Sequence, residues 1–222
     1  MQLAPHRHRG GGVKTMAKKK EKRKVTKPKA STGPKCECGG TFKPVTLRRF
    51  DFSRYAGLPS FLDGAPGWRC GSCQREMLHG QVVNASLFFI AMDIVGFPHR
   101  LTAGFARYLR RSMQITQQEL ADRMGIARET VASWESSLKE ISPQHDLILR
   151  VLMSNHARSS EAIPTKVLVD IANDVMATLS SVRSEPAPRK TPDLLVTESD
   201  FKKLPAAWLS KMQNTAPTVF AL

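Results

Sequence analysis

The sequence predicts a mainly α-helical protein with a small β-rich module before the helices and a disordered segment at each end. Two close cysteine pairs enclose a stretch of alternating apolar residues, which is typical of a small metal-stabilised sheet. Apolar residues between positions 99 and 157 recur at helical spacing, and the two ends of the chain are poor in apolar residues. The length of 222 residues allows one or two small domains plus tails.

Most of the excess positive charge lies in the first 35 residues, which hold 12 Lys and Arg against the single acid Glu21. They therefore carry +11 of the chain's net charge of +15. With few apolar residues to bury, residues 1–35 should form a disordered basic arm that contacts DNA phosphates without sequence preference. A solubilising leader is the alternative. Gly10 to Gly12 lie shortly before Met16, where G-rich codons would form a ribosome-binding sequence, so we expect translation to start at Met16 rather than Met1.

Four cysteines predict a structural zinc site in a module spanning residues 36–82. Cys36 and Cys38 form one pair, and Cys70 and Cys73 form another after 31 intervening residues. Each pair supplies two thiolates from one tight turn, as a tetrahedral zinc ribbon requires, and Gly39, Gly40 and Gly71 allow positive φ in those turns. A thioredoxin-like redox site is the alternative, but no strand-helix-strand pattern surrounds the second pair.

The insert between the cysteine pairs has the alternation expected of short strands. Val45, Leu47, Phe50 and Phe52 alternate in two short registers. We expect four further apolar residues to pack beside the metal, namely Phe61, Leu62, Trp68 and Met77. Because the module is small, the bound metal should contribute much of its folding energy.

A connecting helix is expected over residues 83–98. The longest apolar stretch, Val82 to Phe97, is interrupted by Asn84 and Asp93 and is shorter than the roughly 20 residues of a membrane span. The N-terminus has no apolar core behind its basic residues, so it does not resemble a secretory signal. We therefore expect a cytoplasmic protein, without a membrane partner.

Residues 99–157 show a series of short helices. Phe105, Leu109 and Met113 recur at a spacing of four and predict a first helix that ends near Gln114. Thr116 and Glu119 have the spacing of a capping box and begin a second helix.

Gly125 should end the second helix, because glycine adopts the left-handed conformation most readily. A third helix is expected from Ala127 to Ser136, with Val131 and Trp134 facing the core, and a closing helix from Pro143 to Met153. Two short helices joined by a glycine turn are typical of a module that reads the DNA major groove.

Three stretches, Ile115 to Ala121, Gly125 to Val131 and Trp134 with Glu135, resemble the Cro/repressor (Xre) helix-turn-helix family. The resemblance implies a five-helix, Cro/repressor-like domain over residues 99–157. It also implies DNA-contacting roles for five residues of this sequence: Gln117, Arg128, Glu129, Thr130 and Ser133.

Each implied role has a chemical basis, with surface solvation as the alternative. Gln117, at a helix N-terminus, would hold a phosphate, and Thr130 would lie near the DNA backbone. Arg128, Glu129 and Ser133 would read bases, Arg128 by gripping guanine and Glu129 by accepting from cytosine. The family usually has Ser or Thr where this chain has Ala127, so we expect the recognition helix to start more weakly, by about 1 kcal/mol.

A four-cysteine module followed by this helix-turn-helix resembles the MqsA-like (YgiT-type) regulators and antitoxins over roughly residues 36–155. The one-residue spacing of Cys36 and Cys38 departs from that family's usual first pair. The resemblance implies a homodimer on a palindromic operator and a zinc domain that can bind a toxin. We therefore expect a bacterial, nucleoid-associated transcriptional regulator with one zinc per chain, or alternatively an antitoxin that autoregulates its operon.

The sequence leaves the dimer contacts and the C-terminus open. Contacts could come from Leu87 to Met92, from the closing helix, or from an amphipathic pattern at Thr165 to Leu179 within a C-terminal helix at residues 158–182. For each segment, burial within its own domain is the alternative. Residues 183–222 are expected to be a linker and tail, whose sparse apolar residues fit either a docking motif or disorder. Paired carboxylates, a Ser/His constellation and a phosphate-binding loop are missing from the sequence, so we expect no enzyme.

Overall fold

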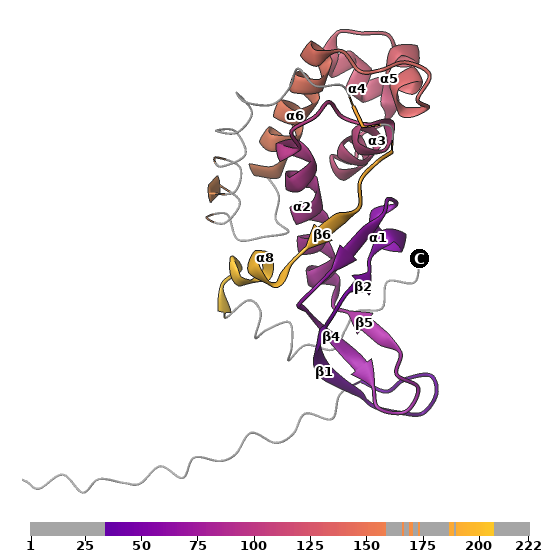
Figure 1. Ribbon diagram of the computed structural model, residues 1–222, viewed down its shortest axis with the longest axis vertical. Coiled ribbons are helices and arrows are strands. Elements are labelled where there is room, and N and C mark those ends of the chain that lie inside the picture. Colours follow the sequence, from indigo (N-terminus) through magenta and orange to yellow (C-terminus); the bar gives the residue numbers. More distant parts are fainter. Residues whose placement is uncertain are drawn as a thin grey trace, which may run out of the picture. The chain divides into compact units, whose positions relative to one another are not determined.

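The computed structural model describes residues 34–158, 187–188 and 190–206, together with the isolated positions 166, 169, 170 and 173. The predicted basic arm, except its last two residues, and most of the helix expected at residues 158–182 lie outside this described part. The strands are β1 (Phe42–Leu47), β2 (Phe50–Asp51), β3 (Ser60–Leu62), β4 (Ala65–Cys70), β5 (Glu76–Leu78) and β6 (Leu194–Val196). The helices are α1 (Ser53–Ala56), α2 (Gly80–Gly96), α3 (Ala103–Ser112), α4 (Gln117–Met124), α5 (Arg128–Glu135), α6 (Pro143–Arg158) and α8 (Glu198–Lys202) (Figure 1).

The cysteine module contains an antiparallel sheet with the strand order β1-β4-β5. Phe42 lies opposite Cys70 and Leu47 lies opposite Ala65, so the turns that carry the cysteines lie at one end of this strand pair. Phe42 and Leu47 are both buried, while the residues between them on β1 are exposed or half-buried. The predicted β-rich region before the helix-turn-helix is confirmed, and β1 and β2 correspond to the two registers expected from the sequence.

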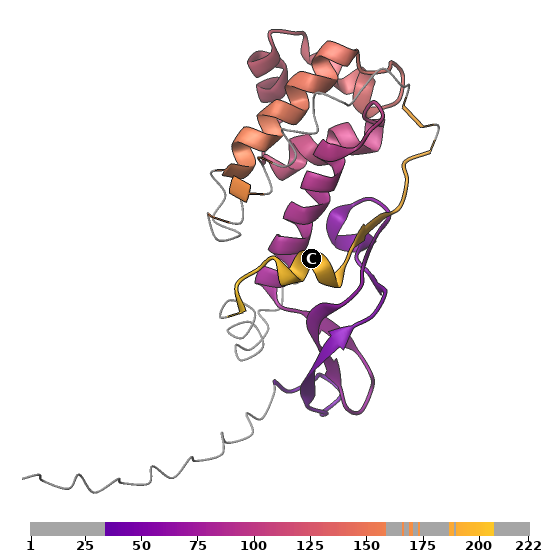
Figure 2. The ribbon, with the colours of Figure 1, turned by 60° about the vertical axis from the view of Figure 1, so that its left-hand side comes forward.

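A second sheet has the order β2-β3-β6 and includes residues from near the C-terminus. β6 pairs in parallel with β3, with Leu194 and Val196 buried and Leu195 between them exposed. Figures 1 and 2 show this segment beside strands from the start of the chain. Of the two alternatives left open for the C-terminal segment, disorder is therefore wrong for residues 194–204, and docking onto the rest of the fold is what the structure has.

The physical reason is that the few apolar residues of this segment find a distant partner. Phe201 and Leu204 are buried, and the Phe201 ring packs edge-on against Phe89 of α2 at a centroid distance of 6.1 Å. β6 also covers the backbone edge of β3, which would otherwise lack hydrogen-bond partners. These contacts join residues that are more than 100 positions apart in the sequence, so no local sequence pattern predicts them.

Helix α2 forms the centre of the fold. It is apolar around most of its circumference, and it packs against β6, α1, α3 and α6. The imidazole of His79 caps it, accepting a hydrogen bond from the Gln81 N–H at 3.2 Å. Five of the six residues from Leu87 to Met92 are buried in this core, so they are not a free surface for a second copy.

A buried arginine on α6 closes the C-terminal end of α2. Arg150 is fully buried and donates to the carbonyl oxygens of Val95, Phe97 and His99 at 2.8, 2.6 and 2.7 Å. These carbonyls include ones that a helix end leaves without intrahelical partners. Arg150 Nε also lies 2.5 Å from Asp146, and the same carboxylate accepts a 2.6 Å hydrogen bond from the Leu101 N–H. This clamp ties α6 to the segment between α2 and α3.

Residues 99–157 contain four helices, α3 to α6, rather than the five predicted from the family resemblance. The predicted first helix, the second helix starting after Thr116, the third and the closing helix are all present at or near the expected bounds. Within the described residues, no helix is long and apolar enough to cross a membrane.

Candidate nucleic-acid interface and metal centre

Helix α4 begins with the capping box that the sequence predicts. The Glu119 N–H donates to the Thr116 hydroxyl oxygen at 3.1 Å, and the Thr116 N–H donates to the Glu119 carboxylate at 2.7 Å. The pKa of Glu119 is lowered, because the backbone and side chain of Thr116 hydrogen-bond to its ionised form. The cap sets where α4 starts.

The turn between α4 and α5 is built on glycine. Gly125 has φ +66°, in the left-handed region, and its N–H bonds back to α4 carbonyls. Ala127 occupies the N-cap of α5 without a side-chain hydrogen bond, as expected from its missing hydroxyl. This turn leads directly into the N-terminus of α5.

The five residues expected to contact DNA lie on α4 and α5, and they differ in exposure. Arg128 and Glu129 are exposed, whereas Thr130 and Ser133 are half-buried. The Ser133 hydroxyl donates to the Thr130 carbonyl oxygen at 2.7 Å, within the same helix. The half-buried Gln117 donates through Nε2 to Glu135 at 2.9 Å, and this bond joins the start of α4 to the end of α5.

A charged network around Glu135 holds the helix pair, and the sequence reasoning did not identify it. The buried Glu135 carboxylate accepts a hydrogen bond from Arg110 Nε at 2.6 Å and a second one from another Arg110 nitrogen at 3.0 Å. Arg107 donates to the Glu135 carbonyl oxygen. Burial opposes ionisation of Glu135, but hydrogen bonds from Arg110 and Gln117 outweigh it and lower the carboxyl pKa. The sequence feature that could have pointed to this network is Glu135 itself, a charged residue directly after the core residue Trp134.

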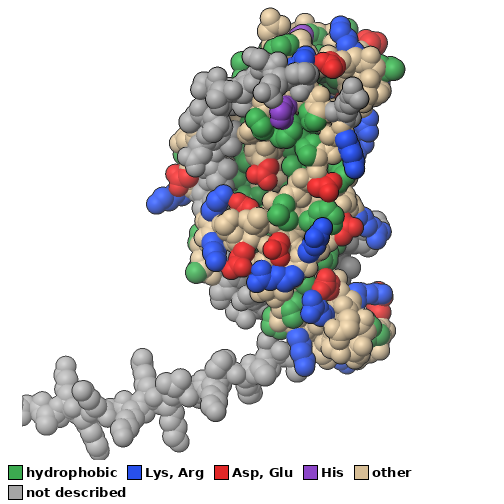
Figure 3. Space-filling view, viewed as in Figure 1, with side chains coloured by type: hydrophobic (Ala, Val, Ile, Leu, Met, Phe, Trp, Pro, Cys, Tyr) green, Lys and Arg blue, Asp and Glu red, His purple; other side chains and the backbone are tan. Residues whose placement is uncertain are grey.

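Acidic and basic side chains are mixed on the face of the molecule shown in Figure 3. Residues 99–157 hold eight Lys and Arg against six acids. Figure 3 shows Lys and Arg interspersed with Asp and Glu on the face it presents, without one large basic patch. The near balance of charge in residues 99–157 favours base selection by particular side chains over a strong general field.

The four cysteines meet at one point. The Cys36 and Cys73 sulfurs are 3.6 Å apart, the Cys38 and Cys70 sulfurs are 3.5 Å apart, and all four lie within 4.8 Å of one another. A tetrahedron with Zn–S bonds of about 2.3 Å has sulfur–sulfur edges of about 3.8 Å. The cluster is therefore close to the size that a bound zinc ion needs.

Backbone hydrogen bonds close the two ligand turns. The Cys36 N–H donates to the Gly40 carbonyl oxygen at 2.7 Å, and the Cys70 N–H donates to the Arg75 carbonyl oxygen at 2.9 Å. The pKa of the Cys70 thiol is lowered to about 6, because the backbone N–H groups of Cys73 and Ser72 donate hydrogen bonds to its sulfur. Such hydrogen bonds favour the thiolate form that binds a metal.

Only one of the three expected glycines adopts a positive φ. Gly39 has φ +84°, while Gly40 and Gly71 stay outside that region. Gly40 is needed for space instead: a Cβ there would lie 2.6 Å from the Ser72 hydroxyl oxygen and 2.8 Å from the Cys70 sulfur. At Gly71 the nearest atom would be 3.7 Å away, so that position tolerates a side chain.

A small apolar cluster supports the cysteines. It contains Cys36, Phe42, Trp68 and Cys70, with Met77 packed against it. Trp68 and Met77 were expected there. Leu62 instead belongs to the main core, and the half-buried Phe61 lies under the Arg49 guanidinium at 5.6 Å.

Comparison with known proteins identifies the class of the helical domain. A family model described as helix-turn-helix matches residues 107–145, which contain α4, the Gly125 turn and α5. The chain thus carries a helix-turn-helix domain, the kind of domain that binds DNA in regulators of transcription. Searches of curated proteins and of solved structures found no match.

Proposed function

We propose that the protein is a sequence-specific transcriptional regulator that inserts α5 into the DNA major groove. The observation that carries this proposal is the exposure of Arg128 and Glu129 in the first turn of α5, directly after the glycine turn. Arg128 grips guanine O6 and N7, and Glu129 accepts from cytosine N4. Ser133 lies about one turn further along the same helix and is the third residue that contacts a base.

Gln117 and Thr130 position the helix on the backbone. A glutamine amide carries two N–H donors, so the bond to Glu135 leaves the second for a phosphate oxygen. The N-terminus of α4 adds its unpaired backbone N–H groups and its dipole. The basic residues before position 35 supply salt-dependent attraction without base choice.

The regulator acts as a homodimer on a palindromic operator, since one recognition helix reads only a few base pairs. Two helices about 34 Å apart meet successive major grooves on one side of the duplex. This arrangement fits a regulator in the bacterial cytoplasm, associated with the nucleoid.

Each chain holds one structural zinc ion through Cys36, Cys38, Cys70 and Cys73. The separations between the four sulfur atoms support this assignment. The role is structural rather than catalytic, because four thiolates leave no open coordination position.

The second candidate function is an antitoxin of the MqsA-like type. The order of the modules favours it, with a four-cysteine sheet before the helix-turn-helix. In that case the module of residues 36–82 binds the toxin and the helix-turn-helix autoregulates the operon. A toxin gene adjacent to this one supports the antitoxin, and its absence supports the plain regulator.

The proposal is tested by selecting an operator from random duplexes and measuring its affinity for variants. Arg128→Ala should weaken binding by about 5- to 150-fold and relax the preference at one base pair. Ser133→Ala should also weaken it, whereas Arg48→Ala, on the cysteine module, should not. If the α5 variants bind normally while substitutions in Lys18 to Lys24 abolish binding, base reading by α5 is wrong. Zinc is tested separately by metal analysis of protein purified without chelator.

A further inference from the structure

Helix α6 shows the reverse of the side-chain distribution expected of a surface helix. Its charged residues between positions 143 and 157 are Asp146 and Arg150, and both are buried in the clamp described above. Leu147 and Ile148, on the same turns, are exposed over 46% and 39% of their surface. A surface helix normally turns its charged side chains to water and its apolar ones to the core. This reversal indicates that the outer side of α6 contacts a partner rather than water.

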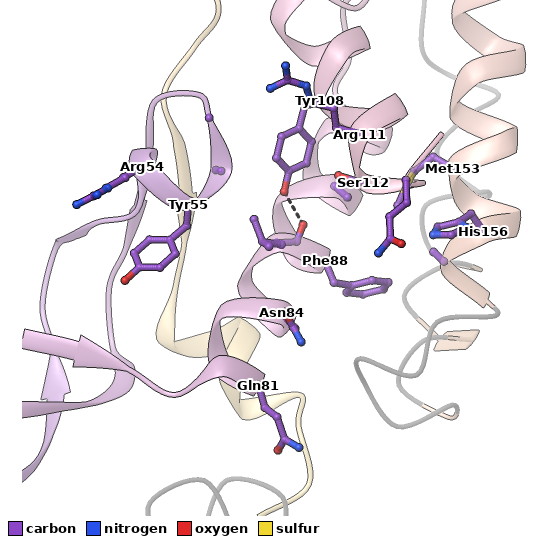
Figure 4. Close-up of a pocket in the computed structure, with 16 residues that line it drawn as sticks. Arg54, Tyr55, Gln81, Asn84, Phe88, Tyr108, Arg111, Ser112, Met153 and His156 are labelled. Carbon is purple, nitrogen blue, oxygen red and sulfur yellow. Dashed lines mark hydrogen bonds between the residues drawn. The ribbon is translucent and has the colours of Figure 1, made fainter. Parts of the chain in front are cut away.

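The outer side of α6 is an uncharged stripe at positions 144, 147, 148, 151, 152 and 155, here called the α6 stripe. These positions are three or four residues apart along the helix, so they share one face. Val151 and Leu152 continue the apolar surface and are half-buried, while the exposed amides of Gln144 and Asn155 lie at its two ends. The opposite side of the helix is already occupied, because it packs on α2 and α3. Figure 4 shows Met153 and His156 on the side of α6 that faces α2.

The α6 stripe is complementary to itself when two copies of α6 cross in opposite directions about a two-fold axis. With the axis between positions 149 and 150, Ile148 of one copy lies against Val151 of the other, and each contact occurs twice. No like charges meet, because the stripe carries none. Opposite directions also align the two helix dipoles favourably. The remaining pairs are Leu147 with Leu152 and Gln144 with Asn155.

We propose that the α6 stripe is the interface between two copies of this chain. The proposal rests on the homodimer of the proposed function and assigns its contact surface. Most of the alternative segment from Leu87 to Met92 is buried in its own core, whereas the α6 stripe is open. One helix face is small beside the roughly 800 Å² per partner of a standard interface, so we expect a weak dimer, with a dissociation constant of about 1–100 μM.

Sedimentation velocity of the full-length, zinc-loaded protein without DNA measures this dimer. Ile148→Asp should raise the dissociation constant at least about tenfold, because two carboxylates would be desolvated against apolar side chains. Val151→Lys should do the same. The matched control is Leu195→Asp, which changes an apolar residue of β6 that is 52% exposed and should leave the dimer unchanged.

Mixing the two monomeric variants tests the direction of the helices and guards against misfolding. In a mixed dimer the introduced carboxylate lies opposite the introduced ammonium group at one contact, and the native Ile148–Val151 contact is kept at the other. We therefore expect the equimolar mixture to dimerise at concentrations where each variant alone stays monomeric. Two folded variants that do not associate when mixed would overturn the antiparallel contact.

Three other results would overturn the interface. A wild type that stays monomeric at about 1 mM has no such dimer. An unchanged dissociation constant in Ile148→Asp places the dimer contact elsewhere. If this variant also unfolds at lower urea concentration while its dimer is unchanged, the stripe is covered within the chain, and Thr165 to Leu179 is then the candidate occupant.

Failure of this interface can be told apart from failure of the proposed function. Monomeric Ile148→Asp should bind a duplex with one half-site as tightly as the wild type, since α5 is untouched. It should bind the complete palindrome at least about tenfold more weakly, because the second half-site no longer gains from linked binding. A wild type without preference for any duplex sequence would instead contradict the proposed function, whatever its oligomeric state.

Discussion

The Arg150 clamp makes the strongest stability prediction, for the substitution Arg150→Met. Methionine keeps an unbranched apolar side chain but removes the guanidinium group. Asp146, itself buried, then loses the guanidinium with which it forms an ion pair. The carbonyl oxygens of Val95, Phe97 and His99 lose donors at 2.6 to 2.8 Å.

The expected loss follows from what is left unpaired. Breaking a buried ion pair by removing one partner costs about 3–5 kcal/mol, because the remaining charge stays buried. The orphaned carbonyls keep the loss from falling below this range, since each costs about 1–3 kcal/mol when water cannot reach it. A domain with a total stability of about 5–15 kcal/mol would lose a large fraction of it. The midpoint of thermal unfolding should fall by roughly 6–20 °C.

Urea denaturation followed by circular dichroism, with zinc present throughout, measures this loss. The matched control is Arg158→Met, in the last turn of the same helix, where the side chain is exposed. It should change the free energy of unfolding by less than about 0.5 kcal/mol. The double variant Asp146→Asn with Arg150→Met should lose less than the sum of its single changes. If Arg150→Met costs no more than Arg158→Met, the clamp does not stabilise the fold.

Three further predictions concern the metal site and the Glu135 network. Gly40→Ala should weaken zinc affinity by about tenfold or more, because its Cβ would push the two ligand turns apart, whereas Gly71→Ala should not; chelator competition measures both. Equal zinc affinities of the two variants would show that the cysteine turns move apart without weakening the site. In variants that retain one tryptophan, zinc removal should shift the emission of Trp68, which packs on two of the ligands, and leave that of Trp134 unchanged. A shift of both would mean that the metal supports the helical domain as well. The lowered pKa of Glu135 contributes stability above its unfolded pKa of about 4.5, which is lost as pH falls through the folded value. Urea midpoints at pH 6 and pH 3.5 should therefore differ less in Glu135→Gln than in the wild type, and an equal difference would contradict the assignment.

Local patterns were sufficient for the helix-turn-helix. The Thr116 cap and the Gly125 turn each involve residues within five positions of one another, so the sequence carries the whole interaction. The cysteine cluster was also predictable, because thiols at two close spacings have few other uses in a chain of this kind.

The partners of several predicted residues could not be read from the sequence. Gln117 was expected at a phosphate, but its amide also bonds to Glu135, 18 positions later. Position 40 requires glycine because a Cβ there would clash with Ser72 and Cys70 across the module, rather than because of its own φ. In each case the deciding contact joins residues that no helical or strand period relates.

The sequence by itself determined the local elements: the capped helices, the glycine turn, the paired cysteines and the uneven charge. Those features depend on backbone preferences and on side chains only a few residues apart. Only the tertiary structure decided that residues 194–204 fold onto β3 and α2, and that Arg150 closes the end of α2. The physical reason is that an open strand edge and unpaired carbonyls are satisfied by whichever distant group the fold brings within reach.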